Sequence, residues 1–262
     1  MEKITKAQVK LVKSLQQKKF RDELGLFVAE GDKCVSELAK AFQLEYRIQS
    51  TEYRPDQSVL CQAQPVRTLS ATRSEIEQMS GLRTPQGVVG VFRKRPMDNG
   101  QWTMDDIVLA LDGIQDPGNL GTIIRTCDWF GVHDIVCSLD TADCYNPKVV
   151  QATMGALARV RVHYVDLPAW LEEYRIQNTE HRPIYGTLLD GKDMYEIVES
   201  QKSKVESGII VMGNEGNGIS QEVRKLITDP IRIPSYPKNV ETSESLNVSI
   251  ATAIVLAEFR RQ

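Results

Sequence analysis

The sequence predicts an α/β protein whose C-terminal part folds as a doubly wound parallel sheet. Beyond residue 106, short runs rich in β-branched apolar residues alternate with stretches of helical periodicity. Segments rich in glycine and asparagine directly follow two of these runs, at residues 107–111 and 209–212. Open α/β sheets bind ligands at the carboxyl ends of their strands, so we expect the function to depend on these segments.

The N-terminal 21 residues have the pattern of a basic amphipathic helix. Ile4, Leu11 and Leu15 recur at near-helical spacing, and the segment has Glu2 as its one acidic residue. Such a helix either presents an ordinary solvated face or contacts the phosphates of a nucleic acid, and the sequence leaves both interpretations open. The basic residues of the segment are Lys3, Lys6, Lys10, Lys13, Lys18, Lys19 and Arg21.

The next 75 or so residues have the pattern of a small α/β domain, because short strand patterns alternate with short helical ones. Residues 84–87 predict a turn before the last strand, and Ser74 is a candidate cap for the second helix. No residues in this region have catalytic spacing. The expected strands are residues 26–29, 46–49, 58–61 and 88–92, and the expected helices are residues 32–42 and 74–79.

A change of composition predicts a linker, since proline, aspartate, asparagine and glycine occur together within residues 96–100. We therefore expect an N-terminal domain of residues 1–96, a linker of residues 97–105 and a C-terminal domain of residues 106–262. In the C-terminal domain the expected strands are residues 107–111, 134–137, 160–164, 183–187, 208–212 and 230–233. The expected helices are residues 120–130, 148–157, 168–177, 220–227 and 245–260.

Composition and charge argue against several classes of protein. The chain of 262 residues has no apolar run long enough to span a membrane, and its first residues lack the apolar core of a secretory signal. Its five cysteines are widely spaced without a CxxC pair, and its three histidines are scattered. We therefore expect reduced thiols, a cytoplasmic location and no metal site. The net charge of −3 argues against indiscriminate nucleic-acid binding.

The first polar segment, residues 116–121, reads Asp-Pro-Gly-Asn-Leu-Gly. Proline and glycine favour a tight turn there, and Asn119 is a candidate cap for the helix that follows. Arg125 lies about one turn further on, among apolar neighbours. It is either an ordinary surface arginine or a guanidinium placed for a phosphate or a developing oxyanion.

The second polar segment, residues 213–218, reads Gly-Asn-Glu-Gly-Asn-Gly. Its glycine spacing differs from that of a dinucleotide-binding loop, and it follows a late strand of the domain rather than the first. Glu215 lies inside it and would repel a pyrophosphate. The loop therefore favours a cationic or amine-bearing ligand, or a hydroxyl donor, over NAD.

Together with residues 233–234 and 245–251, these segments resemble the three signature motifs of the SpoU/TrmH family, in order and with the same spacing. The family belongs to the SPOUT superfamily, and the resemblance covers about residues 106–262. It implies an enzyme that transfers a methyl group from S-adenosylmethionine to a ribose 2′-hydroxyl of RNA. Ribosomal RNA is the expected substrate in preference to transfer RNA.

The same resemblance implies a parallel-sheet SPOUT fold in which the C-terminal segment forms a deep trefoil knot, although knots are very rare in proteins. The N-terminal region is similar to the family's RNA-binding domain, which is related to ribosomal protein L30e. The family also implies a homodimer in which the second subunit completes the active site. Residues 246–259 are apolar nearly all round, which independently favours burial of this helix in the core or against a partner.

The resemblance also assigns roles to residues. A guanidinium is a poor base, so we expect Arg125 to clamp a phosphate and stabilise the alkoxide. Asn119 and Glu215 would keep the site in register, and Ser245 and Asn247 would position the ribose or the neighbouring loop. The residues expected to line the cofactor are Thr187, Leu188, Met212, Gly213, Gly218, Ile233 and Leu246.

One stretch departs from the family pattern. Residues 235–244 form a longer connection without the usual methionine and glycines, which bears on the loop around the methionine part of the cofactor. Two rival functions stay open, a SPOUT methyltransferase that modifies a base and a non-catalytic RNA-binding homologue. The residues Asn119, Arg125, Glu215 and Ser245 argue against base methylation. The sequence does not identify the modified nucleotide.

Overall fold

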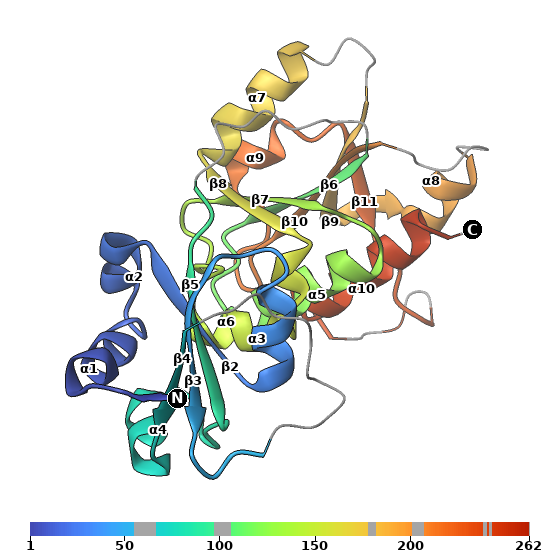
Figure 1. Cartoon of the computed structure of the whole chain (residues 1–262). Helices are drawn as coiled ribbons and strands as arrows, with labels where there is room; N and C mark the ends of the chain where they lie inside the picture. Colours follow the sequence, from blue (N-terminus) through green and yellow to red (C-terminus); the bar gives the residue numbers. More distant parts are fainter. Residues whose placement is uncertain are drawn as a thin grey trace. The chain divides into compact units, whose positions relative to one another are not determined.

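The computed structural model describes residues 1–54, 67–96, 106–177, 182–200, 207–237, 240 and 243–261 (Figure 1). The chain forms two compact units. The first contains residues Met1–Pro96 with Asp143–Arg159, and the second contains Met97–Ala142 with Val160–Gln262. The strand predicted at residues 58–61 and the linker predicted at residues 97–105 lie outside the described residues.

The first unit is a five-stranded mixed sheet with the strand order β1-β4-β3-β5-β2. Strands β1, β4 and β3 run parallel, whereas β5 pairs antiparallel with both β3 and β2. The strands are β1 (Glu2–Lys3), β2 (Leu26–Glu30), β3 (Leu44–Ser50), β4 (Thr68–Ala71) and β5 (Val88–Arg93). The helices are α1 (Lys6–Ser14), α2 (Lys18–Leu24), α3 (Asp32–Leu38), α4 (Arg73–Met79), α6 (Pro147–Thr153) and the short 3₁₀ helix η2 (Ala156–Ala158).

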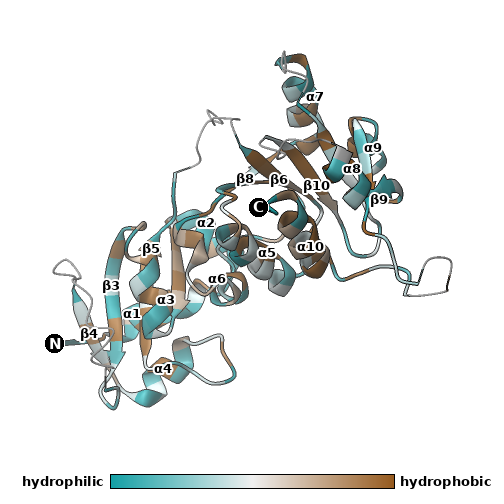
Figure 2. Ribbon diagram, turned by 90° about the vertical axis from the view of Figure 1, so that its right-hand side faces the viewer, coloured by the Kyte–Doolittle hydropathy of each residue, from teal (hydrophilic) through white to brown (hydrophobic). Residues whose placement is uncertain are grey.

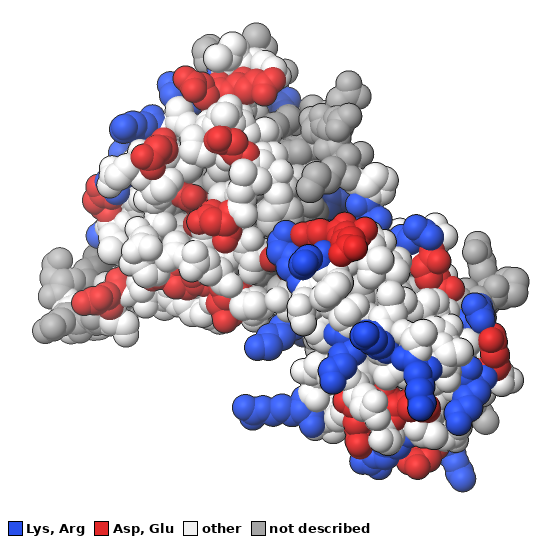
Figure 3. All heavy atoms as spheres, turned by 90° about the vertical axis from the view of Figure 1, so that its left-hand side faces the viewer, with Lys and Arg blue, Asp and Glu red and all other residues white. Residues whose placement is uncertain are grey.

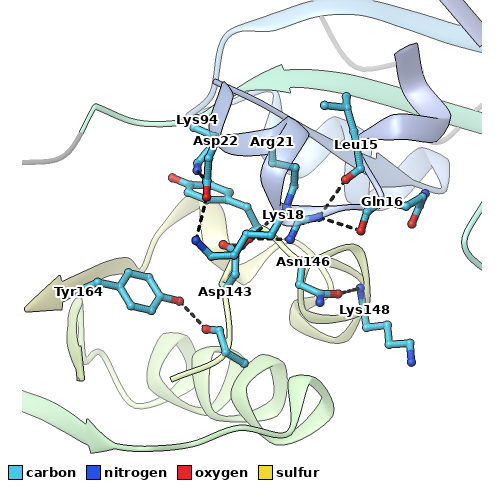
Figure 4. Close-up of polar contacts among 12 residues, drawn as sticks. Leu15, Gln16, Lys18, Arg21, Asp22, Lys94, Asp143, Asn146, Lys148 and Tyr164 are labelled. Carbon is cyan, nitrogen blue, oxygen red and sulfur yellow. Dashed lines mark hydrogen bonds and ion pairs between the residues drawn. The ribbon is translucent and has the colours of Figure 1, made fainter. Parts of the chain in front are cut away.

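The N-terminal segment departs from the single helix that the sequence predicts. Strand β1 precedes α1. Leu15 is the C-cap of α1, and a second helix, α2, begins at Lys18. Leu15 is fully buried and is followed by Arg21, which is 1% exposed and ion-paired with Asp143 (Figure 4). The prediction that Arg21 belongs to an exposed basic face is therefore wrong, because its charge is neutralised inside the first unit.

Helix α4 begins one residue earlier than predicted, and its cap is not Ser74. The hydroxyl of Thr72 accepts from the backbone N–H of Glu75, and the Glu75 carboxylate accepts from the Thr72 N–H in return. This reciprocal capping box satisfies two backbone donors that the helix itself leaves unpaired.

The second unit is a six-stranded sheet in which every described pairing is parallel, in the order β11-β9-β10-β6-β7-β8. The predicted parallel sheet is thus confirmed. Its strands are β6 (Ile107–Asp112), β7 (Asp134–Ser138), β8 (Arg161–Val165), β9 (Ile184–Asp193), β10 (Gly208–Gly213) and β11 (Asp229–Arg232). Its helices are α5 (Pro117–Trp129), α7 (Leu167–Gln177), α8 (Met194–Ser200), α9 (Gln221–Arg224) and α10 (Val248–Phe259).

Helices cover both faces of this sheet, as buried parallel strands require. Val108 and Ala110 of β6 pack with Leu167 and Leu171 of α7, and α9 joins this layer through Val223. Helices α5 and α10 pack against each other in a separate layer (Figure 1). The central strands are apolar throughout, as their brown colour in Figure 2 shows. Within the described residues, no helix is both long and apolar enough to cross a membrane.

Candidate active site

The order of the strands places a topological switch point between β6 and β10. From β6 the chain continues outward through β7 and β8, and then returns to the other side of β6 for β9, β10 and β11. Such a reversal of strand order is the usual ligand site of an open parallel sheet, because the loops leaving the two central strands diverge there. The loop after β6 leads to Asn119, and the loop after β10 contains Glu215.

The helix after β6 is capped by Asp116, so the Asn119 side chain is not needed as a cap. Asp116 is the N-cap of α5, and its Oδ1 accepts from the backbone N–H of Asn119 at 2.8 Å. Pro117 occupies the first helical position, where its lack of an N–H costs nothing. The prediction that Asn119 caps this helix is therefore wrong. Because Asp116 does so, both polar atoms of the Asn119 side chain are available for other partners.

The loop after β10 closes on itself through its backbone. Asn214 and Gly218 exchange two backbone hydrogen bonds of 2.9 Å each. Gly218 has φ +68°, and a Cβ on Gly213 would lie 2.4 Å from the Gly218 carbonyl carbon, so the loop requires glycine at both positions. Glu215 stands exposed near the start of this closed loop.

The third motif supplies Asn247, which is the N-cap of α10. Its Oδ1 accepts from the backbone N–H groups of Ser249 at 3.0 Å and Ile250 at 3.4 Å. The helix therefore begins at Val248, and the prediction that it begins at Ser245 is wrong. An amide whose oxygen caps a helix must direct its NH₂ group elsewhere, so the cap also fixes the direction in which Asn247 donates.

The three motifs meet in one chain of side-chain hydrogen bonds. Asn247 Nδ2 donates to Asn119 Oδ1 at 3.0 Å, and Asn119 Nδ2 donates to Glu215 Oε1 at 2.6 Å. The direction of these bonds follows from the helix cap. Because the Asn247 oxygen accepts from the backbone of α10, its NH₂ group faces the Asn119 oxygen, which leaves the Asn119 NH₂ group for Glu215. These three predicted residues are brought together from positions 96 and 128 residues apart in the chain.

Two other predicted catalytic residues lie outside this cluster. The side chain of Arg125 is exposed on α5 and has no hydrogen bond or ion pair within the described part of the chain. It is six residues beyond Asn119, so it leaves the helix about 120° away from it. Ser245 is also exposed, two residues before the Asn247 cap. Arg125 shares its exposed face of α5 with Gly118, Thr122 and Trp129, and Trp129 is 85% exposed.

The residues predicted to line the cofactor come from β9, from the ends of β10 and β11 with the loop after β10, and from the segment before α10. Thr187 is inside β9, where this strand leaves β10, and its hydroxyl donates to the Val211 carbonyl at 3.1 Å. The Met212 side chain is buried in the core, so it has only backbone atoms to offer a ligand. Ile233 follows β11 and is half-buried, as is Leu188, whereas Leu246 is 50% exposed.

Sequence reasoning missed Asn214, which anchors the loop after β10. Its Oδ1 accepts from the backbone N–H groups of Gly216 at 2.9 Å and Asn217 at 3.1 Å, and its Nδ2 donates to the Gly113 carbonyl at 2.6 Å. The asparagine-glycine composition of the segment indicates a turn. It does not reveal that the side chain reaches a second loop.

The four cysteines in the described part of the chain, Cys34, Cys127, Cys137 and Cys144, are all buried. Cys127 lies on the buried face of α5, and burial raises the pKa of its thiol, which keeps the group neutral. Burial likewise raises the pKa of the Cys34 thiol to about 11. Within the described residues, no group of three or more His, Cys, Asp or Glu side chains is arranged to hold a metal ion.

Comparison with known proteins agrees with this geometry. The model of the SpoU rRNA Methylase family matches residues 106–257, which contain all three polar motifs. This chain belongs to the SpoU rRNA methylase family. The model of the MRM3-like substrate binding domain matches residues 6–90, which form most of the N-terminal part of the chain.

Relatives within the family match almost the whole chain. The 23S rRNA (guanosine(2553)-2'-O)-methyltransferase RlmP of Bacillus subtilis is 29% identical over 253 residues, which are 96% of this chain and 95% of the relative. A putative RNA methyltransferase of the TrmH family from Porphyromonas gingivalis has a solved structure with TM-score 0.83 and 35% identity, and 98% of each chain is covered. The AdoMet-bound rRNA methyltransferase from Sinorhizobium meliloti has TM-score 0.80 and 30% identity, with 100% of this chain and 97% of the other covered.

Proposed function

We propose that this SpoU-family protein is a cytoplasmic, S-adenosylmethionine-dependent methyltransferase that methylates a ribose 2′-hydroxyl of ribosomal RNA. The observation that carries the proposal is the hydrogen-bonded chain from Asn247 through Asn119 to Glu215. It joins one residue from each family motif at the switch point of the sheet. The trefoil knot implied by the resemblance stays a prediction.

The side chains around this cluster suit S-adenosylmethionine. Glu215 presents an exposed carboxylate that accepts from the neutral amide of Asn119, so its charge is available to a cationic ligand. The apolar side chains of Leu188, Ile233 and Leu246 stand half-exposed or exposed beside polar backbone loops. We propose that these loops, with Thr187, Met212, Gly213 and Gly218, hold the cofactor. When bound, S-adenosylmethionine supplies an electrophilic methyl group on a positively charged sulfur.

The chain's own residues would then align the ribose and stabilise its oxygen. Asn119 and Asn247 hold Glu215 in one position, so the site needs little reorganisation when substrate binds. Ser245, two residues before the cap, would contact the ribose. Arg125 would neutralise the negative charge that develops on the 2′-oxygen as its proton passes to solvent water, or clamp an adjacent phosphate.

Alkaline hydrolysis tests this function directly. The protein should transfer labelled methyl groups to ribosomal RNA, and the phosphodiester next to each label should resist alkali, because cleavage requires a free 2′-hydroxyl. Label that is released as a base-modified mononucleotide would instead support base methylation. A protein that binds RNA but neither binds nor consumes S-adenosylmethionine, measured by calorimetry, would support the non-catalytic alternative.

We further propose that residues 1–96 form the domain that sets RNA affinity, joined through residues 97–105 to the catalytic domain of residues 106–262. The first 96 residues have 17 Lys and Arg against 11 Asp and Glu, whereas the rest of the chain has 15 against 24. Figure 3 shows this contrast, with blue side chains over the first unit and more red over the second. The positive charge needed for phosphate contacts is therefore concentrated in the N-terminal part.

Helix α1 presents part of this positive charge on an exposed face. Lys6, Lys10 and Lys13 are all exposed and follow one another at helical spacing, while Val9 and Val12 of the opposite face are buried. No acidic residue lies within α1. Lys18 differs, because it lies in α2 and donates a hydrogen bond to Asp22, which raises the pKa of this lysine. Asp22 also pairs with Lys94. We therefore centre the expected RNA contacts on the α1 face and exclude Arg21, which is buried and paired with Asp143.

Replacing Lys6, Lys10 and Lys13 together by alanine should weaken RNA binding and flatten its salt dependence. Each lost single-strand phosphate contact lowers the slope of log affinity against log salt by about 0.7. We expect a decrease of up to about 2 in that slope for the triple variant, with S-adenosylmethionine affinity unchanged. The measurement is RNA affinity by filter binding at several salt concentrations.

The matched control is Lys18→Ala, which removes a lysine that is paired with Asp22 in α2, outside the α1 face. Its salt slope should stay close to that of the wild type. If the triple variant keeps the wild-type affinity and slope, α1 presents only a solvated face. An equal effect of Lys18→Ala would show that net charge, rather than the α1 face, determines binding.

We also propose a two-fold homodimer that covers part of α10. Within the chain this helix buries Val248, Val255, Leu256 and Phe259, but Ile250 on another face is 52% exposed. Ala257 shares that face with it at helical spacing and is also exposed. An apolar helix with one face left in water favours a partner, and a second copy of the chain can supply it.

The double substitution Ile250→Asp with Ala257→Asp should convert the dimer to a monomer of 29.5 kDa. Both positions are exposed, so the fold of each subunit should survive, and the added carboxylates would face each other across a two-fold axis. Light scattering at micromolar concentration measures the mass. Ile176→Asp is the control, because Ile176 on α7 is 79% exposed and lies outside the proposed interface. A wild-type protein that is already monomeric would contradict the proposal.

A further inference from the structure

Asn214 uses every polar atom of its side chain to join two loops of the second unit. Its Oδ1 accepts from the backbone N–H groups of Gly216 at 2.9 Å and Asn217 at 3.1 Å, which holds its own loop in a tight turn. Its Nδ2 donates to the carbonyl of Gly113 at 2.6 Å, in the turn that leaves β6. The side chain is half-buried, so water competes weakly for these bonds.

The Gly113 end of this contact is itself held in place. Gly113 has φ +71°, a conformation that favours glycine, and its N–H donates to Ser138 Oγ at 2.8 Å. Ser138 in turn donates to Asp140 Oδ1 at 2.6 Å, in the loop after β7. The hydrogen of the Gly113 amide and the oxygen of its carbonyl are thus bound by loops from two different strands. Hydrogen bonds on both sides of Gly113 therefore hold its carbonyl group in place.

Adjacent residues of one loop therefore contact the same segment at two places. Asn214 binds Gly113 at the start of the turn after β6, and Glu215 accepts from Asn119 in the first turn of α5. One contact alone would leave Glu215 free to swing about it. Two contacts from neighbouring residues fix both the distance and the direction of the carboxylate relative to α5.

From this double attachment we infer that Asn214 is a positioning residue for the methyl-transfer site, acting through Glu215. The inference rests on the proposed function. The anchor to Gly113, and not the local turn around Gly216, is the part that matters, because it connects the Glu215 loop to the element that carries Asn119. A displacement of about 1 Å at a reacting centre costs up to about 100-fold in rate.

Two substitutions separate the anchor from the turn. Asn214→Asp keeps an oxygen for the Gly216 and Asn217 N–H groups but places a carboxylate oxygen against the Gly113 carbonyl. Asn214→Ala removes both contacts. We expect both variants to lose about 10- to 100-fold in kcat at saturating S-adenosylmethionine, with the KM for RNA within twofold of the wild type. Asn217→Ala is the control, since this residue contributes its backbone N–H to the turn.

A double-mutant cycle identifies the path of the effect. Because Asn214 acts through Glu215, Asn214→Ala should cost little further activity in a Glu215→Ala background. A purely stabilising residue would instead lower the melting temperature and leave kcat of the folded protein intact.

Wild-type kcat in Asn214→Asp, or an equal loss from Asn214→Ala with and without Glu215, would overturn the inference. Absence of methyl transfer by the wild-type protein would reject the proposed function itself. An active wild type with a fully active Asn214→Ala variant would reject the positioning role alone.

Discussion

Replacing Arg125 by alanine should lower kcat for RNA methylation by about 100- to 1,000-fold, the equivalent of about 2.7–4 kcal/mol of transition-state stabilisation. Arg125 is exposed and has no acidic partner among the described residues, so its charge is not already neutralised within the chain. A guanidinium placed in this way can bind a phosphate or a developing alkoxide without first breaking an ion pair. Single-turnover kinetics with ribosomal RNA measure the effect.

The affinity for S-adenosylmethionine should barely change in this variant, because Arg125 lies outside the loops proposed to bind the cofactor. Arg125→Lys should recover part of the activity, since lysine keeps the charge but lacks the planar pair of donors. Near-normal turnover in Arg125→Ala would show that its role is misassigned. A large loss of affinity for S-adenosylmethionine would show that Arg125 binds the cofactor rather than the RNA.

The direction of Arg125 bears on which active site it serves. It leaves α5 about 120° away from Asn119, on the exposed face that also carries Trp129. We expect it to complete the site of the second subunit in the proposed dimer. A mixed dimer of one Arg125→Ala and one Glu215→Ala subunit should then contain one intact site. Because random mixing makes about half of the dimers mixed, the activity recovered should average up to about half a wild-type site per dimer. No recovery on mixing would restrict Arg125 to its own subunit.

Removing the Asp143 carboxylate should destabilise the first unit by about 3–5 kcal/mol. Arg21 donates to Asp143 Oδ2 from Nε at 3.0 Å and from Nη2 at 2.7 Å, and the two side chains are 2% and 10% exposed (Figure 4). Arg21 Nη1 also donates to the carbonyls of Leu15 and Gln16, at the end of α1. Asp143→Ala would leave a buried guanidinium without its counter-charge, the costly half of a broken buried pair.

Hydrogen-exchange mass spectrometry measures this effect locally, because exchange in α1, α2 and α6 reports the opening of the first unit. Lys18→Ala is the matched control. Its pair with Asp22 belongs to the same helix but is exposed, so we expect a cost of at most about 1 kcal/mol. The double variant Arg21→Met with Asp143→Leu should recover part of the loss, because no unpaired charge stays buried. Unchanged protection in Asp143→Ala would contradict the expectation.

The comparison of Arg21 with Lys10 shows what charge patterning omits. Both residues belong to one basic segment, and the sequence treats them alike. Lys10 is exposed on α1, whereas Arg21 is buried because residues 143–159 pack within the first unit. In sequence, residues 143–159 come after β7 and before β8, and their placement in the first unit depends on contacts between residues more than 100 positions apart.

The regular elements of the catalytic unit were predictable from the chain alone. Apolar β-branched runs with polar segments behind them gave all six strands and their parallel arrangement, because buried parallel strands need side chains that are apolar on both faces. Elements with weaker signals were missed. They include β1, β4 and α8, which are short and have little periodicity of their own.

At the site, the sequence by itself determined which residues carry polar chemistry and the family they resemble. Only the tertiary structure decided how they are used. Asp116 and not Asn119 caps α5, which frees Asn119 to connect Asn247 with Glu215. A local pattern specifies a turn or a cap through nearby backbone groups. The direction in which a side chain then donates depends on segments that only the folded sheet brings together.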